Sequence, residues 1–275
     1  MTTTLRPTEP LQQAADGTRS RHFQVCVNSR PVGAVHLATD PSSGGAAALI
    51  HSLSIDEPDR RRGRGTVAAL AAEEVARSWG CRRLEAAVPA GSEAGTALAR
   101  ALGYTLRNRN MAKRLDGAPP ALPPGSTARA MAPDEFGDWL AAETESYVRA
   151  WTERGGMTEE QARAKARHDH EKLLPHGADT EGMLISVLEH EGTRVGTLWL
   201  ALQDERSFVI DVAADAAHRG RGHGRALLLL AEAQTLAAGR GAIGLNVFAG
   251  NIPAERLYEG LGYLTTLYAY SKSLL

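Results

Sequence analysis

Cysteine and aromatic residues are scarce in this sequence. Its 275 residues include only two cysteines, Cys26 and Cys81, and 5% aromatic side chains. Two cysteines form no disulfide framework and show no metal-binding spacing, so we expect two reduced, packed thiols in a cytoplasmic protein. His168 and His170 give no metal site either, because residues two apart do not share a helix face; a solvated helix surface is expected there. The sequence therefore predicts no metal.

Neither charge sign prevails, which excludes two classes of partner. The 31 Lys and Arg residues are balanced by 32 Asp and Glu residues, for a formal net charge of -1. Proteins that bind nucleic acid or anionic membranes need a cationic excess, so neither partner is expected. No apolar run has membrane-spanning length, because Glu232 and Gln234 interrupt the longest one. Residues 1–20 are polar and contain no signal-peptide core.

A basic, glycine-rich turn stands between a strand and a helix in the second half of the chain. Residues 207–213 alternate and are rich in β-branched side chains, which predicts a strand, whereas residues 225–238 have apolar residues at helical spacing. The intervening glycines, at 220, 222 and 224, follow neither the dinucleotide-binding order nor the P-loop pattern. Glycines next to a helix N-terminus favour a phosphate or pyrophosphate ligand, and a solvated connection is the alternative.

The same turn occurs twice, as part of an internal repeat. Arg60 and Gly63 correspond to Arg219 and Gly222 at an offset of 159, since 219 minus 60 and 222 minus 63 give the same value. The offset also relates Leu-Gly-Tyr at 102–104 to Leu-Gly-Tyr at 261–263. Each copy therefore runs strand, basic glycine turn, helix, strand, helix, Leu-Gly-Tyr and a final strand.

A proline-rich connector at 116–125 separates the copies and predicts a boundary between domains at 1–115 and 126–275. The first domain has little room for helices before its hairpin, so it is a trimmed version of the second. The strands expected ahead of the repeated turns are 23–27, 32–38, 126–131, 183–188 and 195–202, and the helices expected in the second domain before its hairpin are 133–154 and 158–174.

The second copy resembles the catalytic unit of the GNAT superfamily of N-acetyltransferases, and the chain as a whole resembles its tandem, mycothiol-synthase-like members. The resemblance rests on the spacing Arg219-x-x-Gly222-x-Gly224 and on the segment 246–263, which contains Asn251 and Tyr258. It implies an α/β (α+β) fold of two tandem GNAT-type domains, each a mixed, mostly antiparallel twisted sheet flanked by helices. It also implies acetyl-CoA or another acyl-CoA as co-substrate, no metal, and a monomer in which the two copies form a pseudo-dimer, or a homodimer.

The resemblance assigns roles to residues of the second copy. Tyr258 would protonate the departing thiolate, and Asn251 would contact the cofactor; a packed aromatic is the alternative for Tyr258. Asp211, the one carboxylate on its strand before the loop, is the candidate base, directly or through water, although the family's frequent Glu falls nearer Ala213. The alternative for Asp211 is a carboxylate hydrogen-bonded beneath the strand. The expected cofactor-binding residues, with oxyanion donors among the first three, are Val212, Ala213, Ala214, Arg219, Gly220, Arg221, Gly222, His223, Gly224, Arg225 and Asn251.

The first copy lacks these chemical groups. Ser52, Ser92 and Ala99 occupy the positions of Asp211, Asn251 and Tyr258. We therefore expect the first domain to be a non-catalytic partner. Its loop, with Arg60, Gly63 and Gly65, either still binds CoA or only packs.

The expected activity is acyl-CoA-dependent N-acetylation of a small-molecule primary amine. The alternatives are acetylation of a protein amino group and non-enzymatic acyl-CoA sensing. An acidic and aromatic rim on the helices of the second domain suits a cationic amine, and solvated helix faces are the alternative reading. The residues of this rim are Asp134, Glu135, Asp138, Glu143, Glu145, Glu159 and Glu160 among Trp139, Tyr147 and Trp151.

Overall fold

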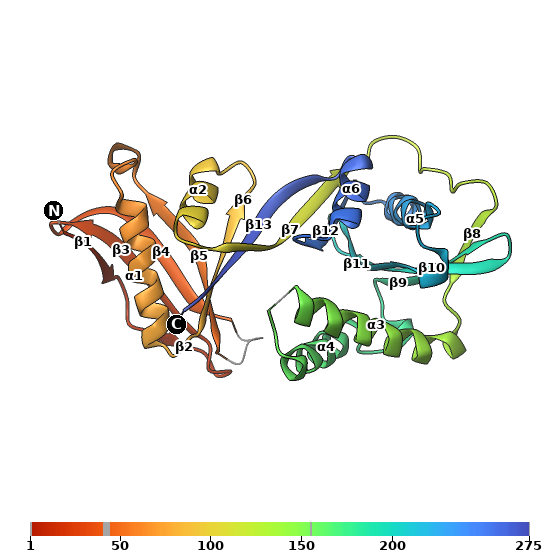
Figure 1. The fold of residues 1–275 in the computed structure, drawn as a ribbon, viewed down its shortest axis with the longest axis horizontal. Helices are drawn as coiled ribbons and strands as arrows, with labels where there is room; N and C mark the ends of the chain where they lie inside the picture. Colours follow the sequence, from red (N-terminus) through yellow and green to blue (C-terminus); the bar gives the residue numbers. More distant parts are fainter. Residues whose placement is uncertain (1, 41–44, 155, 275) are drawn as a thin grey trace. The chain divides into compact units, whose positions relative to one another are not determined.

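The chain divides into two compact units. The computed structural model describes residues 2–40, 45–154 and 156–274 (Figure 1). Unit 1 comprises Met1–Asn108 and Leu267–Leu275, and unit 2 comprises Arg109–Thr266. This division differs from the boundaries expected at 115 and 126, because residues 109–125 belong with unit 2 and residues 267–275 with unit 1.

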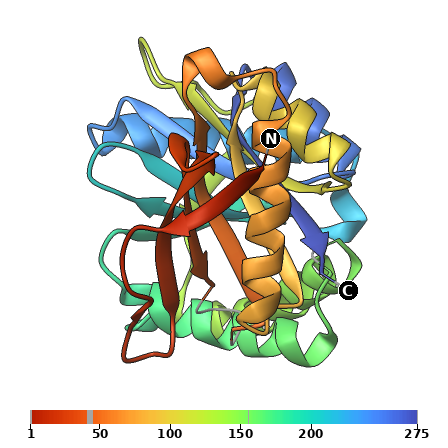
Figure 2. The same ribbon diagram turned by 90° about the vertical axis from the view of Figure 1, so that its left-hand side faces the viewer.

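Unit 1 is a sheet covered by helix α1. The strand order is β1-β3-β4-β5-β6-β13, with β2 paired to β3. β5 and β6 are parallel, and the other registered pairs are antiparallel. Figure 2 shows α1 crossing the sheet. The elements are β1 (Thr3–Pro7), β2 (Gln12–Gln13), β3 (Arg19–Val27), β4 (Arg30–Thr39), β5 (Ala47–Ile55), η2 (Glu57–Asp59), α1 (Arg64–Ser78), β6 (Arg83–Pro89), α2 (Glu93–Ala101), β7 (Thr105–Arg114, shared with unit 2) and the second half of β13 (Leu264–Ser273).

Alternating apolar residues form the core of unit 1. On β3, Phe23, Val25 and Val27 are buried, as period-2 alternation requires when one face of a strand meets a core. Alanines at helical spacing on α1 pack against the same cluster. Cys26 and Cys81 are both free and buried, which confirms packed thiols.

Unit 2 is a sheet with helices on both faces. Its strand order is β7-β12-β11-β10-β9-β8. In Figure 1, α5 and α6 lie on one side of the sheet, and α3 and α4 lie on the other. The elements are β8 (Ser126–Ala130), α3 (Pro133–Glu153), α4 (Glu159–Leu173), η3 (Gly177–Asp179), β9 (Met183–His190), β10 (Thr193–Leu202), β11 (Ser207–Ala214), η4 (Ala216–His218), α5 (His223–Ala237), β12 (Ala242–Phe248) and α6 (Ile252–Gly260).

The two central parallel strands of unit 2 separate where the site begins. β11 and β12 pair only through Ser207–Val209 and Ile243–Leu245. Beyond Val209, β11 continues to Ala214 without a registered partner on β12, while it stays paired to β10. The backbone groups that face the lost partner are therefore open to a ligand.

The later part of the final strand of each repeat lies in the unit built mainly from the other repeat, residues 109–114 of β7 in unit 2 and residues 267–273 of β13 in unit 1. Lys113, on the last strand of the first repeat, donates to both carboxylate oxygens of Glu232 on α5, at 2.7 and 2.8 Å. Lys272, on the last strand of the second repeat, donates to Glu73 on α1, at 2.8 Å to each oxygen. Both glutamates are buried. The offset of 159 relates the two lysines and also the two glutamates, so the two ion pairs are equivalent. In each pair, the lysine of one repeat binds the glutamate of the other repeat.

The predicted elements of both copies are confirmed, including the two helices before the hairpin of unit 2 and the repeated strand, turn, helix, strand and helix. Two strands were missed. β1 pairs with β3 as β8 pairs with β9, so β1 has the place of β8 in the first copy, and β2 lies where the second copy has α3 and α4. Apart from Leu5 and Pro7 the residues of these two strands are polar, and all are exposed or half-buried, so hydrophobic periodicity could not reveal them.

Candidate active site

The glycine-rich loop of unit 2 has the conformation that an anion site requires. Gly220 and Gly222 have φ of 75° and 87°, in the left-handed region that glycine enters without strain. Gly222 is the N-cap of α5, whose fifteen residues start at His223. The first N–H groups of α5 and the positive end of its dipole therefore face the loop. Arg219, Arg221 and Arg225 are exposed beside them.

The loop also positions α5 against the neighbouring helix. A Cβ at Gly224 would lie 3.2 Å from Cδ2 of Leu257 on α6, so only a small residue fits there comfortably. His223 is buried next to His190 and His218, with ring centroids 5.3 and 6.2 Å away. Burial and these neighbours lower the pKa of His223.

Asp211 lies on β11 where that strand leaves β12. It is opposite Trp199 of β10, at a register shift between Trp199 and Leu200. Its side chain is half-buried. Desolvation and the charge of Glu143 raise the pKa of Asp211 to about 7, with a partial opposing effect from the backbone N–H of Val212. A carboxyl that titrates near neutrality is matched to general-base work.

Tyr258 and Asn251 come from α6. Tyr258 is buried, with its ring 6.1 Å from that of Tyr263, and burial followed by the charge of Asp211 raises the pKa of Tyr258 to about 12. A phenol in this state keeps its proton at neutral pH and can donate it. Asn251 is the N-cap of α6, yet its side chain makes no capping hydrogen bond. Its amide is therefore not committed to the helix end.

Two helices close the other side of Asp211. Glu143 of α3 is 8% exposed, and its Oε2 lies 2.6 Å from Nε2 of His170 on α4. His170 Nδ1 is 3.3 Å from the Thr144 hydroxyl, which donates its own proton to the carbonyl of Leu140. The Tyr147 hydroxyl donates to Asp169. The expectation of a solvated helix surface holds for His168, which is exposed, but is wrong for His170, because α4 turns His170 toward α3.

The acids expected to form a rim differ sharply in environment. Glu135 pairs with Arg129, and both Glu145 and Glu159 pair with Arg163. Among the seven, only Glu143 is buried. It shares a stripe at four-residue spacing with Trp139, Tyr147 and Trp151, and that spacing is the signal by which the sequence distinguishes it.

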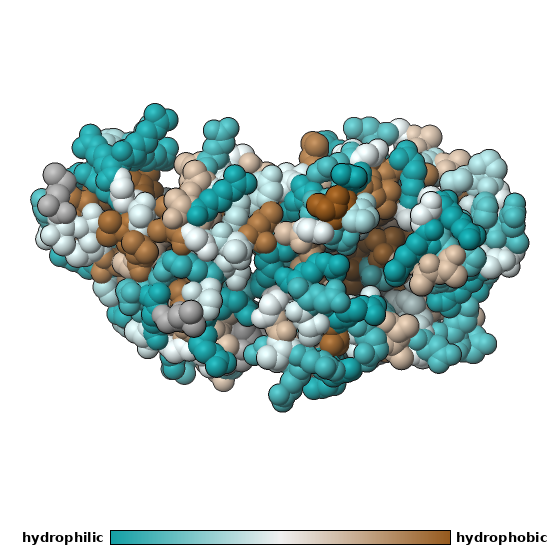
Figure 3. Space-filling view, viewed as in Figure 1, coloured by the Kyte–Doolittle hydropathy of each residue, from teal (hydrophilic) through white to brown (hydrophobic). Residues whose placement is uncertain are grey.

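The elements that carry these groups flank a recess in unit 2. In Figure 3, apolar atoms line a hollow in the surface of unit 2, between α5 and α3 in that view, while hydrophilic side chains cover much of the surrounding face. The glycine loop, Asp211 and Tyr258 are contributed by the strand and helices on one side, and Glu143 by a helix on the other.

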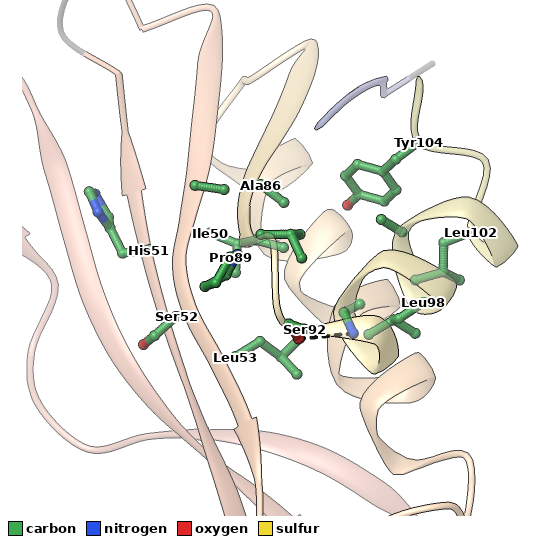
Figure 4. A pocket seen from close by; sticks show the side chains of 15 residues that line it. Ile50, His51, Ser52, Leu53, Ala86, Pro89, Ser92, Leu98, Leu102 and Tyr104 are labelled. Carbon is green, nitrogen blue, oxygen red and sulfur yellow. Dashed lines mark hydrogen bonds between the residues drawn. The ribbon is translucent and has the colours of Figure 1, made fainter. Parts of the chain in front are cut away.

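Unit 1 has other side chains at the positions equivalent to Asp211, Asn251 and Tyr258. A cavity of about 140 Å³ lies beside β5, β6 and α2, lined among others by Leu98, Ala99 and Tyr104 (Figure 4). Ala99 corresponds to Tyr258, so the cavity occupies the place that the larger side chain fills in unit 2. In Figure 4, Ser52 points away from the cavity. Ser92 caps α2 by accepting from Gly95 N–H at 3.2 Å, as a structural residue does.

Within the described residues, no group of three or more His, Cys, Asp or Glu side chains is arranged to hold a metal ion. In the same part of the chain, no helix combines the length and apolar character needed to cross a membrane.

Comparison with known proteins gives a consistent result. The profile of the acetyltransferase (GNAT) family matches residues 2–104 and 138–263. A mycothiol acetyltransferase from Streptomyces griseus is 31% identical over 256 residues, covering 89% of this chain and 77% of that protein. The uncharacterised N-acetyltransferase YycN of Bacillus subtilis is 29% identical over 149 residues, covering 52% of this chain and 96% of that protein.

Solved structures share the fold across nearly the whole chain. A GCN5-related N-acetyltransferase from Sphaerobacter thermophilus superposes with a TM-score of 0.61 at 22% identity, covering 92% of this chain and 80% of that one. A tandem GNAT protein from the clavulanic acid biosynthesis pathway superposes with a TM-score of 0.54 at 21% identity, covering 96% and 85%. The expected tandem arrangement of two mixed sheets with flanking helices is thereby confirmed.

Proposed function

The chain belongs to the acetyltransferase (GNAT) family, and from this premise we propose that its second unit moves an acetyl group from acetyl-CoA to a primary amine of a small molecule. The observation that carries the proposal is the meeting of Asp211, Tyr258 and the glycine loop where β11 leaves β12. Relatives that match over most of both chains are named mycothiol acetyltransferases, which supports a small-molecule acceptor.

The glycine loop binds the pyrophosphate of the co-substrate in this proposal. Left-handed glycines and the N-terminus of α5 supply N–H donors, and Arg219, Arg221 and Arg225 supply charge. The uncommitted amide of Asn251 is placed to contact the pantetheine arm. The arm then follows the gap between β11 and β12, which delivers the thioester to Asp211 and Tyr258.

The transfer requires one base and one acid. Asp211 takes a proton from the acceptor's ammonium group, directly or through water, and the neutral amine attacks the thioester carbonyl carbon. Backbone N–H groups among Val212–Ala214 stabilise the oxyanion that forms. As the new C–N bond is kept and the C–S bond breaks, Tyr258 protonates the leaving thiolate. The nitrogen then loses its second proton, which reprotonates Tyr258, and Asp211 releases the first proton to solvent, so that each cycle yields one free proton.

The first unit is a non-catalytic partner in this proposal. Its glycine turn is kept, but Ser52, Ser92 and Ala99 offer no base near neutrality, no uncommitted amide and no phenol. Catalysis therefore depends on residues of unit 2 alone.

The proposal is tested by thiol release from acetyl-CoA in the presence of a panel of small primary amines and lysine-containing peptides. We expect turnover with at least one small amine and none above background with the peptides. Turnover confined to peptides would point to protein acetylation, and tight CoA binding without any turnover would point to a sensor.

A further inference from the structure

Glu143 is an anomaly in the helix that carries it. One stripe of α3 consists of Trp139, Glu143, Tyr147 and Trp151 at four-residue intervals, and Glu143 is its one carboxylate. Trp139 packs edge-on against Trp199 of β10, with ring centroids 5.6 Å apart, and Trp151 packs against Phe248 of β12, so the stripe meets the sheet at both ends. Tyr147, between them, donates to Asp169 of α4. A buried carboxylate in such surroundings costs stability unless a partner offsets the loss of hydration.

Within the described chain, the Glu143 carboxylate has unused hydrogen-bonding capacity. His170 Nε2 lies 2.6 Å from its Oε2, but neither atom makes a hydrogen bond of normal geometry there, although both are shielded from solvent. The side chains of Glu143 and His170 are 6% and 11% exposed. Their arrangement leaves acceptor capacity that a donor from outside the chain could use.

A second carboxylate faces the same place. Asp211 is paired in register with Trp199 of β10, whose ring centroid is 5.6 Å from that of Trp139 and 5.9 Å from that of His170, so Asp211 lies on the face of the sheet that α3 and α4 cover. The charge of Glu143 also raises the pKa of Asp211. Two desolvated carboxylates repel each other unless a cation lies with them. A primary ammonium group fits this requirement, since it has one positive charge and three N–H donors, whereas a hydroxyl has no charge and a single donor.

We propose that Glu143 and Asp211 form the binding site for the ammonium group of the acceptor, with Glu143 held from α4 by His170, so that the enzyme selects small molecules carrying a protonated primary amine. Tyr147 and Trp151 continue the stripe toward Phe248, whose ring is 5.1 Å from that of Trp151. These rings give the body of the acceptor an aromatic wall. Glu143 is thus a specificity residue, and its assignment rests on the proposed acetyl transfer at Asp211.

The test compares a cation with its neutral analogue. Benzylamine and benzyl alcohol have the same ring, which suits the aromatic wall, but only the amine is charged. Binding of each to CoA-loaded protein is measured by ligand-observed NMR, in the wild type, in Glu143→Gln and in Glu145→Gln. Glu145 is a matched control, because it lies on the same helix but is exposed and paired with Arg163.

We expect the wild type and Glu145→Gln to prefer benzylamine over benzyl alcohol, and Glu143→Gln to bind benzylamine roughly ten- to a hundred-fold more weakly. In thiol-release assays, Glu143→Gln should raise KM for the amine while KM for acetyl-CoA stays within about twofold. Equal benzylamine binding by wild type and Glu143→Gln would overturn the inference. Absence of thiol release with every amine, with amine binding still dependent on Glu143, would count against the acetyl transfer and support the ammonium site.

Discussion

Asp211 and Tyr258, the proposed base and acid, share one buried environment. Burial raises the pKa of both side chains, to about 7 for the carboxyl and to about 12 for the phenol. The first shift makes a carboxylate basic enough to take a proton from an ammonium group, and the second keeps a phenol protonated until a thiolate needs its proton. A raised pKa therefore suits both proposed roles, the base at Asp211 and the acid at Tyr258.

The activity should depend on the ionisation of Asp211. We expect kcat/KM for the amine to fall about tenfold for each pH unit below 7, because the base is then protonated. The measurement is a profile of thiol release between pH 5 and 9. Asp211→Asn should remove most of the activity, and a wild-type profile that is flat down to pH 5 would exclude Asp211 as the base.

Asp211 should also lower stability at the pH where it works. Its pKa is raised in the folded state, so the folded protein holds this proton more tightly than the unfolded chain, and the stabilisation is lost as pH rises from about 4 through about 7. Asp211→Asn should therefore raise Tm relative to wild type, and more at pH 8 than at pH 5. Equal changes in Tm at the two pH values would contradict the shift.

Removing the hydroxyl of Tyr258 should slow chemistry without weakening co-substrate binding. We expect Tyr258→Phe to reduce kcat by roughly a hundred-fold or more, the usual contribution of a general acid, with KM for acetyl-CoA nearly unchanged. Steady-state thiol release measures both values. Tyr263→Phe is the control, since that ring neighbours Tyr258 but its hydroxyl lies toward Glu232; a similar loss in both variants would assign the effect to packing.

Among the elements, α5 begins at the left-handed Gly222, which sets the direction of the N-terminus that we propose binds the pyrophosphate. Gly222→Ala forces a side chain into φ of 87°, at a cost of about 1 kcal/mol, and should turn the N–H groups away from the pyrophosphate. We expect KM for acetyl-CoA to rise severalfold. Gly63→Ala is a matched control with φ of 73° at the start of α1, and it should lower stability without changing KM. Equal KM increases in both variants would show that unit 1 takes part in turnover.

The order of elements could be predicted because both copies have the same basic glycine turn and the same hydrophobic periodicity. Each element predicted in one copy was therefore also indicated 159 residues away in the other. The role of Glu143 could not be read from its type, because Glu145 and Glu159 are chemically the same. Only its spacing with Trp139, Tyr147 and Trp151 sets it apart, and the burial that raises the pKa of Asp211 depends on α3 meeting β11. The contact between α3 and β11 cannot be predicted from sequence periodicity.

For the whole molecule, the exchanged final strands tie each repeat to the stability of the other unit. The alternation of side chains on β13 would be the same whichever strand it paired with. The sequence therefore did not predict that Leu267–Ser273 pair with β6. Two ion pairs between the repeats, Lys113 with Glu232 and Lys272 with Glu73, stabilise this exchange of final strands.

A substitution in the first repeat should therefore destabilise the second unit. Lys113→Ala leaves the buried Glu232 without its ammonium partner, which we expect to cost roughly 3 kcal/mol. Hydrogen exchange should then rise in α5 more than in α1, and the added change Glu232→Gln should restore most of the protection. Faster hydrogen exchange confined to α1 would contradict the pairing of the first repeat's final strand with unit 2.

We propose that the chemistry belongs to unit 2 and that unit 1 only retains the loop. The most direct measurement is kcat for thiol release with a small primary amine in two double variants, Asp211→Asn with Tyr258→Phe, and Arg60→Ala with Gly63→Asp. We predict that the first has no turnover above background yet still binds acetyl-CoA, and that the second keeps a kcat within about twofold of wild type, as uncoupled sites do. Turnover that survives in the first double variant and disappears in the folded second one would contradict the account.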